Sequence, residues 1–263
     1  MRQFFRVGSI DYEEVNNDIG RFVLGPSGGV VEREPHFSYF TLQGGVLALH
    51  TKSRGKVGGG KRGKIWGFSH ASRARLIRFL NTIESEASVF VTLTYPGEFD
   101  NAYSKLHLKR FANWFRNRFP SASFFWKLEY QRRGAAHYHL IIWGVDCDSD
   151  FRSLIAQSWY RIVASNDDRH LSAGTQCDVP NGPWRFYLSK YISKVDDYET
   201  VGHTGRIWGF HNKSALSFFP VRYSVVSAEV YDSLKAFNGD SSARCHNPDE
   251  LEALNQYLDS ILL

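Results

Sequence analysis

Cysteine is scarce in this chain of 263 residues, and its scarcity narrows the class of protein. The three cysteines, Cys147, Cys177 and Cys245, are odd in number and widely spaced, and no Cys-x-x-Cys pair occurs. A disulfide framework is therefore disfavoured, and a reducing compartment is indicated. A zinc-containing structural domain is disfavoured for the same reason, because such domains rely on cysteine ligands.

Long hydrophobic runs are also missing. No run of about 18 apolar residues occurs, which is the length needed to cross a bilayer, so no membrane partner is expected. The first residues, MRQFFRVGSIDYEE, contain no apolar stretch of the kind found in secretory signal peptides. Hydrophobic residues still make up 43% of the chain, which is enough to build a substantial core.

Acidic residues are absent from one long segment. Between Arg54 and Arg78 there are eight Lys and Arg residues and no Asp or Glu, in a chain with net charge +5 and a pI of about 9.0. This local excess of positive charge indicates a polyanionic partner. We expect the DNA-binding side chains to be Arg54, Lys56, Lys61, Arg62, Lys64 and Arg73 from this segment, together with Arg132 and Arg133 from a later turn.

Part of this basic segment resembles a nucleotide-binding P-loop. It reads Gly55-x-x-x-x-Gly60-Lys61, but Arg62 stands where a Ser or Thr would be needed to ligate Mg²⁺, and no apolar helix follows at once. We interpret residues 53–64 as a basic loop that contacts a DNA backbone. Nucleotide hydrolysis is thereby disfavoured, so no helicase domain is expected and any helicase must be a separate protein.

The spacing of apolar residues predicts a mixture of strands and helices. Strands are predicted at 37–42, 46–50, 89–95, 123–131 and 137–145, helices at 70–84, 105–119, 151–164, 186–195, 228–237 and 249–262, and only turns in 166–183. We expect one continuous domain over 1–263. Within it, residues 1–85 form a basic N-terminal extension integrated with the rest, and residues 228–263 form a helical tail.

Two histidines lie two residues apart on a predicted strand. Because side chains alternate along a strand, His137 and His139 are expected on one face, and two neutral imidazoles there could begin a divalent-metal site. A hairpin centred on Arg133 would place Glu129 opposite His137 as a third ligand, with Thr92 and Thr94 on the same face. The alternatives are structural histidines and a surface Glu129 paired with Arg132 or Arg133.

Two tyrosines lie one helical turn apart in Tyr187-Leu-Ser-Lys-Tyr191-Ile-Ser-Lys194. Tyrosine is a weak nucleophile at neutral pH, and the nearby Lys190 and Lys194 would favour its phenolate. A bound Mg²⁺ or Mn²⁺ would stabilise the charge that develops on a scissile phosphate. Two tyrosines allow two successive strand transfers, although tyrosines at this spacing also commonly line a helix core.

These motifs resemble those of the HUH endonucleases, specifically the rolling-circle replication initiators of phages and plasmids. Three segments carry the resemblance in family order: Phe90-Val-Thr-Leu-Thr-Tyr-Pro96, His137-Tyr-His139 and Tyr187–Lys194. The resemblance implies an α+β fold with a five-stranded antiparallel sheet flanked by helices. It also implies site-specific nicking of single-stranded origin DNA, a 5′-phosphotyrosine and a free 3′-hydroxyl.

The resemblance also implies roles for individual residues. His137 and His139 would be metal ligands, with Glu129 as the acidic third ligand. We predict that Tyr191 initiates and that Tyr187 performs the second transfer. The expected partners are the single-stranded origin and a host helicase and DNA polymerase, in the cytoplasm of a bacterial host.

Other readings of the sequence remain open. A single-strand DNA transposase or a mobilisation relaxase would use the same chemistry, but relaxases often carry the tyrosine before the histidines. A non-catalytic origin-binding or repressor protein would bind DNA through the basic segment and use the histidines only structurally. Binding is salt-sensitive in every case, so metal-dependent covalent attachment to DNA is the property that separates them.

Overall fold

The computed structural model describes residues 22–24, 30–32, 38–51, 68–96, 101–182, 184–185 and 205–261. The chain forms two compact units. We call one the central unit (Lys61–Leu76 and Glu84–Phe218) and the other the terminal unit (Met1–Gly60, Ile77–Ile83 and Phe219–Leu263). The expectation that 1–263 is one continuous domain stays a prediction.

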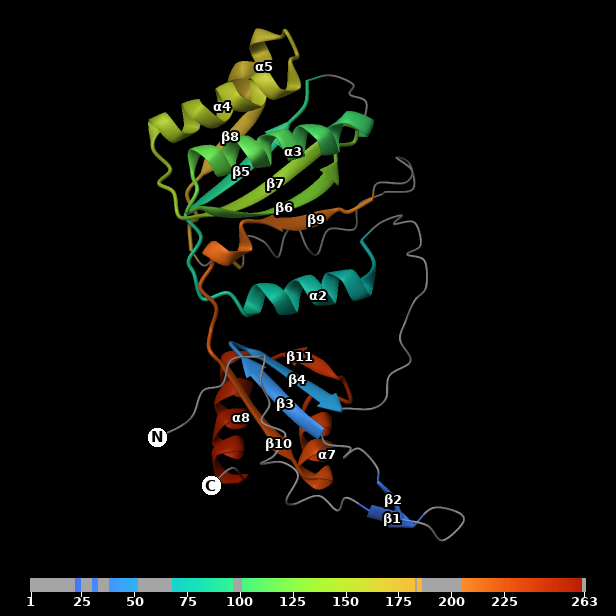
Figure 1. The fold of residues 1–263 in the computed structure, drawn as a ribbon. Helices are drawn as coiled ribbons and strands as arrows, with labels where there is room; N and C mark the ends of the chain where they lie inside the picture. Colours follow the sequence, from blue (N-terminus) through green and yellow to red (C-terminus); the bar gives the residue numbers. More distant parts are fainter. Residues whose placement is uncertain are drawn as a thin grey trace. The chain divides into compact units, whose positions relative to one another are not determined.

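The central unit is built on a five-stranded antiparallel sheet (Figure 1). Its strand order is β8 (Thr175–Asp178), β5 (Val89–Thr94), β7 (Ala136–Trp143), β6 (Ser123–Tyr130) and β9 (Trp208–His211). The predicted α+β class with a five-stranded sheet flanked by helices is confirmed. The histidine strand β7 lies in the middle, where neighbours on both sides satisfy its backbone and fix its register.

Two helices, α3 (Asn101–Arg118) and α4 (Ser149–Val163), cover one face of this sheet (Figure 1). Alternate residues of β5, β6 and β7 point into a core that includes Val91, Leu128 and Tyr138. The helices add Phe111 and Trp159, both fully buried, and their rings meet edge to face. This packed layer leaves the opposite face of the sheet to carry the histidines.

The segment 166–183 was predicted to contain only turns, and that prediction is wrong. It contains helix α5 (Asp168–Ala173) and the edge strand β8. The Asp167 side chain accepts a hydrogen bond from the backbone N–H of Arg169 and so begins the helix. Strand β8 is short and polar, and its pairing with β5 rather than its own composition makes it a strand.

The terminal unit has a second antiparallel sheet, of four strands, that the sequence did not predict as a sheet. Its order is β10 (Val221–Val226), β3 (Ser38–Gln43), β4 (Val46–Thr51) and β11 (Ala243–Cys245). Helices α7 (Ala228–Phe237) and α8 (Pro248–Ile261) bury Leu234, Leu254 and Leu258 against it. The predicted helices at 228–237 and 249–262 are confirmed, as are the two strands near residues 40 and 48.

Several shorter elements complete the described chain. The strands β1 (Phe22–Leu24) and β2 (Val30–Glu32) pair with each other, and η1 (Lys213–Ala215) is a single 3₁₀ turn. Helix α2 spans His70–Asn81 and so ends three residues before the predicted boundary. At this end the Thr82 hydroxyl donates a hydrogen bond to the Phe79 carbonyl. Among the described residues, no helix is long and apolar enough to cross a membrane.

Candidate active site

The paired histidines lie side by side on the open face of β7. The ring centroids of His137 and His139 are 4.6 Å apart, whereas Tyr138 between them points into the core on the other face. This is the alternation that the His-x-His spacing predicted. Because β7 is the middle strand, both imidazoles are held on a rigid part of the sheet.

The predicted hairpin register is confirmed. Glu129 of β6 lies directly opposite His137, and Lys127 lies opposite His139. On the other side of β7, Thr94 pairs with His137 and Thr92 with His139. Cross-strand partners share a face, so two hydroxyls and a carboxylate accompany the imidazoles. The tight turn at 131–134, closed by the hydrogen bond from the Gly134 N–H to the Gln131 carbonyl, sets this register.

The carboxylate of Glu129 is buried rather than exposed, with only 2% of the residue accessible. One oxygen lies 2.7 Å from the ammonium nitrogen of Lys127, and the other lies 3.3 Å from Nε2 of His139. The alternative of a surface carboxylate paired with Arg132 or Arg133 is therefore wrong. A charge this deeply buried needs a partner of opposite sign, and Lys127 supplies it from the same strand.

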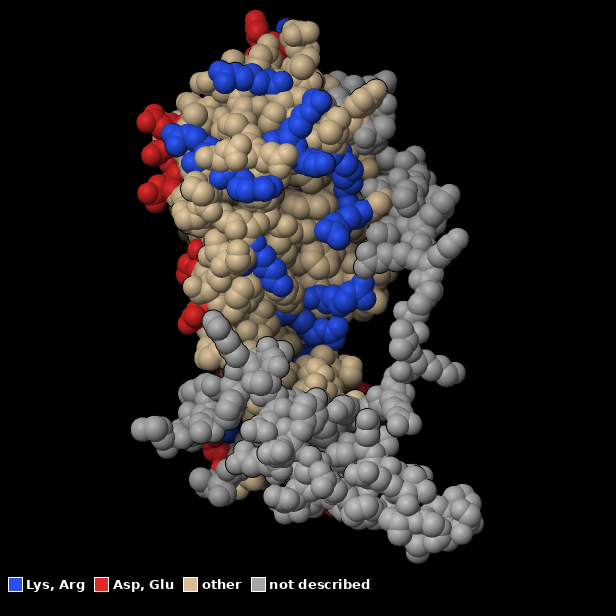
Figure 2. Space-filling view, in the orientation of Figure 1, with Lys and Arg blue, Asp and Glu red and all other residues tan. Residues whose placement is uncertain are grey.

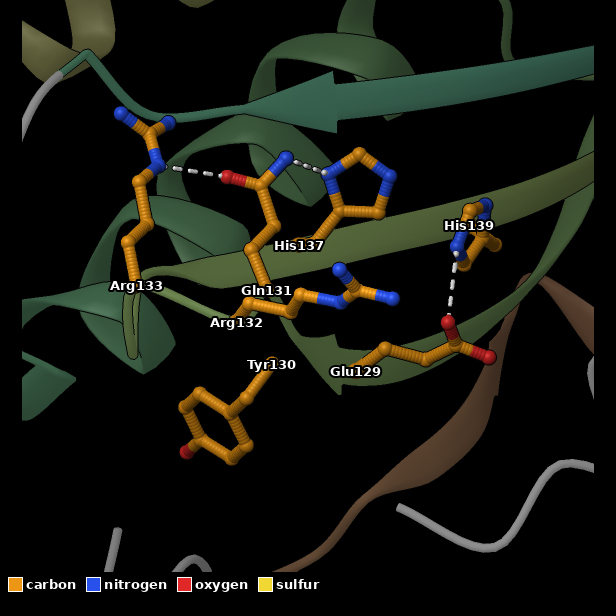
Figure 3. Close-up of a pocket in the computed structure, with 7 residues that line it drawn as sticks. All are labelled: Glu129, Tyr130, Gln131, Arg132, Arg133, His137 and His139. Carbon is orange, nitrogen blue, oxygen red and sulfur yellow. Dashed lines mark hydrogen bonds and ion pairs between the residues drawn. The ribbon is translucent and has the colours of Figure 1, made fainter. Parts of the chain in front are cut away.

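A chain of polar contacts holds the ring of His137 (Figure 3). Its Nδ1 lies 3.2 Å from the Thr94 hydroxyl and 3.3 Å from the amide nitrogen of Gln131. The amide oxygen of Gln131 accepts a 2.8 Å hydrogen bond from Nε of Arg133, whose other end donates to the Tyr95 carbonyl. Sequence reasoning missed Gln131, because a glutamine at the end of a strand carries no motif.

A cavity of about 560 Å³ opens above these groups. Its lining residues are Glu129, Tyr130, Gln131, Arg132, Arg133, His137 and His139. The guanidinium of Arg132 points into the space between Glu129 and His137 (Figure 3). An arginine in that position can make paired hydrogen bonds to phosphate oxygens, so the cavity joins a cationic group to the carboxylate–imidazole cluster.

The donor types of this cluster suit Mg²⁺ or Mn²⁺, which accept carboxylate and imidazole ligands. Glu129 Oε2 and His139 Nε2 are 3.3 Å apart, and ligand atoms at about 2.0–2.2 Å from one ion lie roughly 3.0–3.5 Å from each other. In the part of the chain that the structure describes, no group of three or more His, Cys, Asp or Glu side chains is assembled to hold a metal ion. The pair therefore fits an ion as it stands, and His137 is the nearest further donor on that face.

Several predicted site residues lie outside the described residues: Tyr187, Tyr191, Lys190 and Lys194 of the tyrosine segment, and Arg54, Lys56, Lys61, Arg62 and Lys64 of the basic segment. Of the predicted DNA-binding residues, Arg132 and Arg133 line the cavity. Arg73 of α2 does not approach it in any contact of the described residues. Its guanidinium lies 5.2 Å from the ring of Phe68, and its buried Nε has no hydrogen-bond partner among those residues.

Positive charge is also concentrated on α3 of the central unit. The helix contains no acidic residue and carries Lys105, Lys109, Arg110, Arg116 and Arg118. Figure 2 shows Lys and Arg side chains gathered over α3 and the neighbouring strands, with Asp and Glu side chains at a separate edge. The cationic surface expected for a polyanion-binding protein therefore extends beyond the basic segment recognised in the sequence.

Comparisons with known proteins agree with this site. Residues 88–196 match a family model of replication-associated proteins of the ORF2 type, and this range contains β5, β6 and β7. Over 165 residues the chain is 26% identical to a replication-associated protein of Pseudomonas phage Pf3. That alignment covers 57% of this chain and 59% of the relative, so the chain spans less than two thirds of the relative's length. No solved structure matches the chain. The two matches together support a phage replication initiator.

Proposed function

We propose that this protein initiates rolling-circle replication by nicking single-stranded DNA at an origin. The observation that carries the proposal is the cluster of Glu129, His137 and His139 in one cavity, at the positions that the hairpin register predicts. The cluster lies inside the region that matches replication-associated proteins. A buried carboxylate facing two imidazoles beside an exposed arginine is suited to binding a phosphate group and assisting its transfer.

The reaction is a transesterification at phosphorus. The phenolate oxygen of a tyrosine forms a bond to the phosphorus of the scissile phosphodiester, and the bond from phosphorus to the 3′-oxygen breaks. The phenol proton goes to a base or to water, and the departing 3′-oxygen takes up a proton. The products are a 5′-phosphotyrosine and a free 3′-hydroxyl that can prime synthesis.

The residues of the cavity have distinct parts in this proposal. Glu129, His137 and His139 would hold Mg²⁺ or Mn²⁺, which when bound would supply Lewis-acid stabilisation of the phosphate charge. Arg132 would bind a non-bridging phosphate oxygen. Gln131 and Thr94 are positioning residues, because they contact His137 and fix the orientation of its ring.

The nucleophiles belong to the tyrosine segment. In the proposal Tyr191 attacks first and Tyr187 performs the second transfer, with Lys190 and Lys194 favouring the phenolate forms. The second transfer would return the strand end to a 3′-hydroxyl and so release or close the strand. The expected partners are an origin in single-stranded DNA and a host helicase and polymerase, in the cytoplasm of a bacterial host.

A covalent-adduct assay tests the proposal. The protein is mixed with single-stranded circular phage DNA that contains the cognate origin, with Mn²⁺ or with EDTA, and separated on a denaturing gel. We expect a shifted protein band that requires metal and disappears in the Tyr187→Phe/Tyr191→Phe variant. Tight binding of cognate DNA with no adduct would instead indicate a non-catalytic origin-binding protein. An adduct formed at the wild-type rate by Tyr191→Phe alone would refute the assignment of the first step.

A further inference from the structure

A second cavity in the central unit lies on the other side of β6 from the histidine cluster. It has a volume of about 400 Å³. It is lined by Lys105, Leu108, Lys109 and Ala112 of α3, Phe124 and Trp126 of β6, and Gly205, Arg206, Phe210 and His211 in and before β9. Trp126 and Phe124 point away from the face that carries Lys127 and Glu129, because side chains alternate along β6. The cavity is thus separate from the candidate active site.

The charge of this cavity is entirely positive. Lys105, Lys109 and Arg206 contribute three cationic side chains, and no acidic residue lines it. The ammonium group of Lys105 donates a hydrogen bond to the Arg206 carbonyl and lies 4.8 Å from the centre of the Trp126 ring. Lys109 and Arg206 are exposed at the rim, where a ligand phosphate can reach them.

The wall of the cavity offers a flat aromatic surface. A Cβ atom at Gly209 would lie 2.9–3.0 Å from three atoms of the Trp126 indole, so the glycine allows the indole to lie against the β9 backbone. Beside it the rings of Phe124 and His211 are stacked, with centroids 4.9 Å apart. Half-buried Trp126 is held in place on a rigid strand, as a stacking surface for a planar ligand requires.

From this combination we propose that the α3–β9 cavity binds one nucleotide of single-stranded DNA, with its base against Trp126 and its phosphates at Lys109 and Arg206. Stacked aromatic rings beside a cationic track are the usual means of holding single strands without reading their sequence. A base inside duplex DNA is already stacked on both sides and could not use this surface. The inference rests on the proposed function for its choice of ligand, and the site contributes affinity away from the scissile phosphate.

Salt-dependent binding tests the cationic half of the site. Binding of fluorescein-labelled oligo(dT) is measured by anisotropy in EDTA over a series of NaCl concentrations, so that no cleavage contributes. In Lys109→Ala/Arg206→Ala, loss of two phosphate contacts should reduce the slope of log K against log salt by about 1.4. The matched control Arg161→Ala/Arg169→Ala removes two exposed arginines of α4 and α5 and should keep the wild-type slope. Equal slopes for the two double variants would overturn the proposal.

Cross-linking tests the aromatic half. Oligo(dT) carrying 5-iododeoxyuridine is irradiated with the full-length protein, and the modified peptides are identified by mass spectrometry. We expect a cross-link within 124–130 or 205–211, and Trp126→Leu should weaken oligo(dT) binding about tenfold while Trp126→Phe keeps most of it. Cross-links confined to other peptides would refute the site, even if Trp126→Leu fails to fold.

The two proposals fail separately. Absence of the metal-dependent adduct, with the cross-link and the reduced salt slope still present, would reject the nicking function and leave a single-strand binding site. A normal adduct with wild-type salt slope and no cross-link in these peptides would reject the α3–β9 cavity as a DNA site and leave the nicking function intact.

Discussion

Glu129→Gln separates the structural and chemical parts played by the buried carboxylate. The substitution preserves shape but removes the charge that lies 2.7 Å from Lys127, a residue with no accessible surface. Breaking a buried ion pair at one partner costs about 3–5 kcal/mol. Because a glutamine oxygen can still accept a hydrogen bond from Lys127, we expect the lower end, about 3 kcal/mol. For a unit of this size, that lowers the Tm by roughly 6–12 °C.

The double variant Lys127→Met/Glu129→Gln is the control for this reasoning. It removes both charges, so we expect it to regain most of the lost stability while still forming no DNA adduct. Thermal unfolding followed by circular dichroism measures the first property, and the denaturing-gel assay measures the second. The reasoning would be refuted if Glu129→Gln unfolded at the wild-type temperature, or if the double variant were as unstable as the single one.

Three further predictions follow from neighbouring parts of the central unit. Gln131→Ala should slow adduct formation about ten- to hundredfold by releasing His137, with unchanged oligo(dT) affinity in EDTA, and an unchanged rate would contradict the positioning role. Phe111→Ala should cost about 3–5 kcal/mol in urea unfolding because its fully buried ring packs against other aromatic rings, and a loss below about 1 kcal/mol would contradict that packing. Burial, and secondarily Arg206, lowers the pKa of Lys105 to about 8, so its charge is lost as the pH rises through that value. Oligo(dT) affinity should therefore fall between about pH 7 and pH 9, and not in Lys105→Met, while the unit gains stability above pH 8 because an unfolded lysine stays protonated up to about 10.4.

The sequence predicted the centre of the site well because the relevant interactions are local. Alternation along β7 places His137 and His139 together, and a tight turn fixes the hairpin register that brings Glu129 opposite His137. Both facts follow from a stretch of chain with few alternatives. The same reasoning located Thr92 and Thr94 on the neighbouring strand, because that strand's apolar pattern marks which of its faces is buried.

Other parts of the site and fold depend on contacts distant in sequence. Lys127 is a charged residue in the middle of a strand, and nothing in its neighbourhood predicts that it is fully buried. Strand β9 and the cavity wall at Gly209 arise only when residues 208–211 pair with β6, some eighty residues earlier. Short strands of ordinary composition become strands through their partners, so the four-stranded sheet also escaped prediction.

The terminal unit draws its sheet from both ends of the chain. Gln43 of β3 pairs with Val221 of β10, and the strand β11 that completes β4 comes later still. During synthesis, β3 and β4 therefore emerge from the ribosome long before β10 and β11 exist. The central unit, whose sheet lies between Val89 and His211, can complete its folding in this interval. A nascent or truncated chain that stops before Val221 would expose unpaired edges of β3 and β4, and such edges invite pairing with other chains.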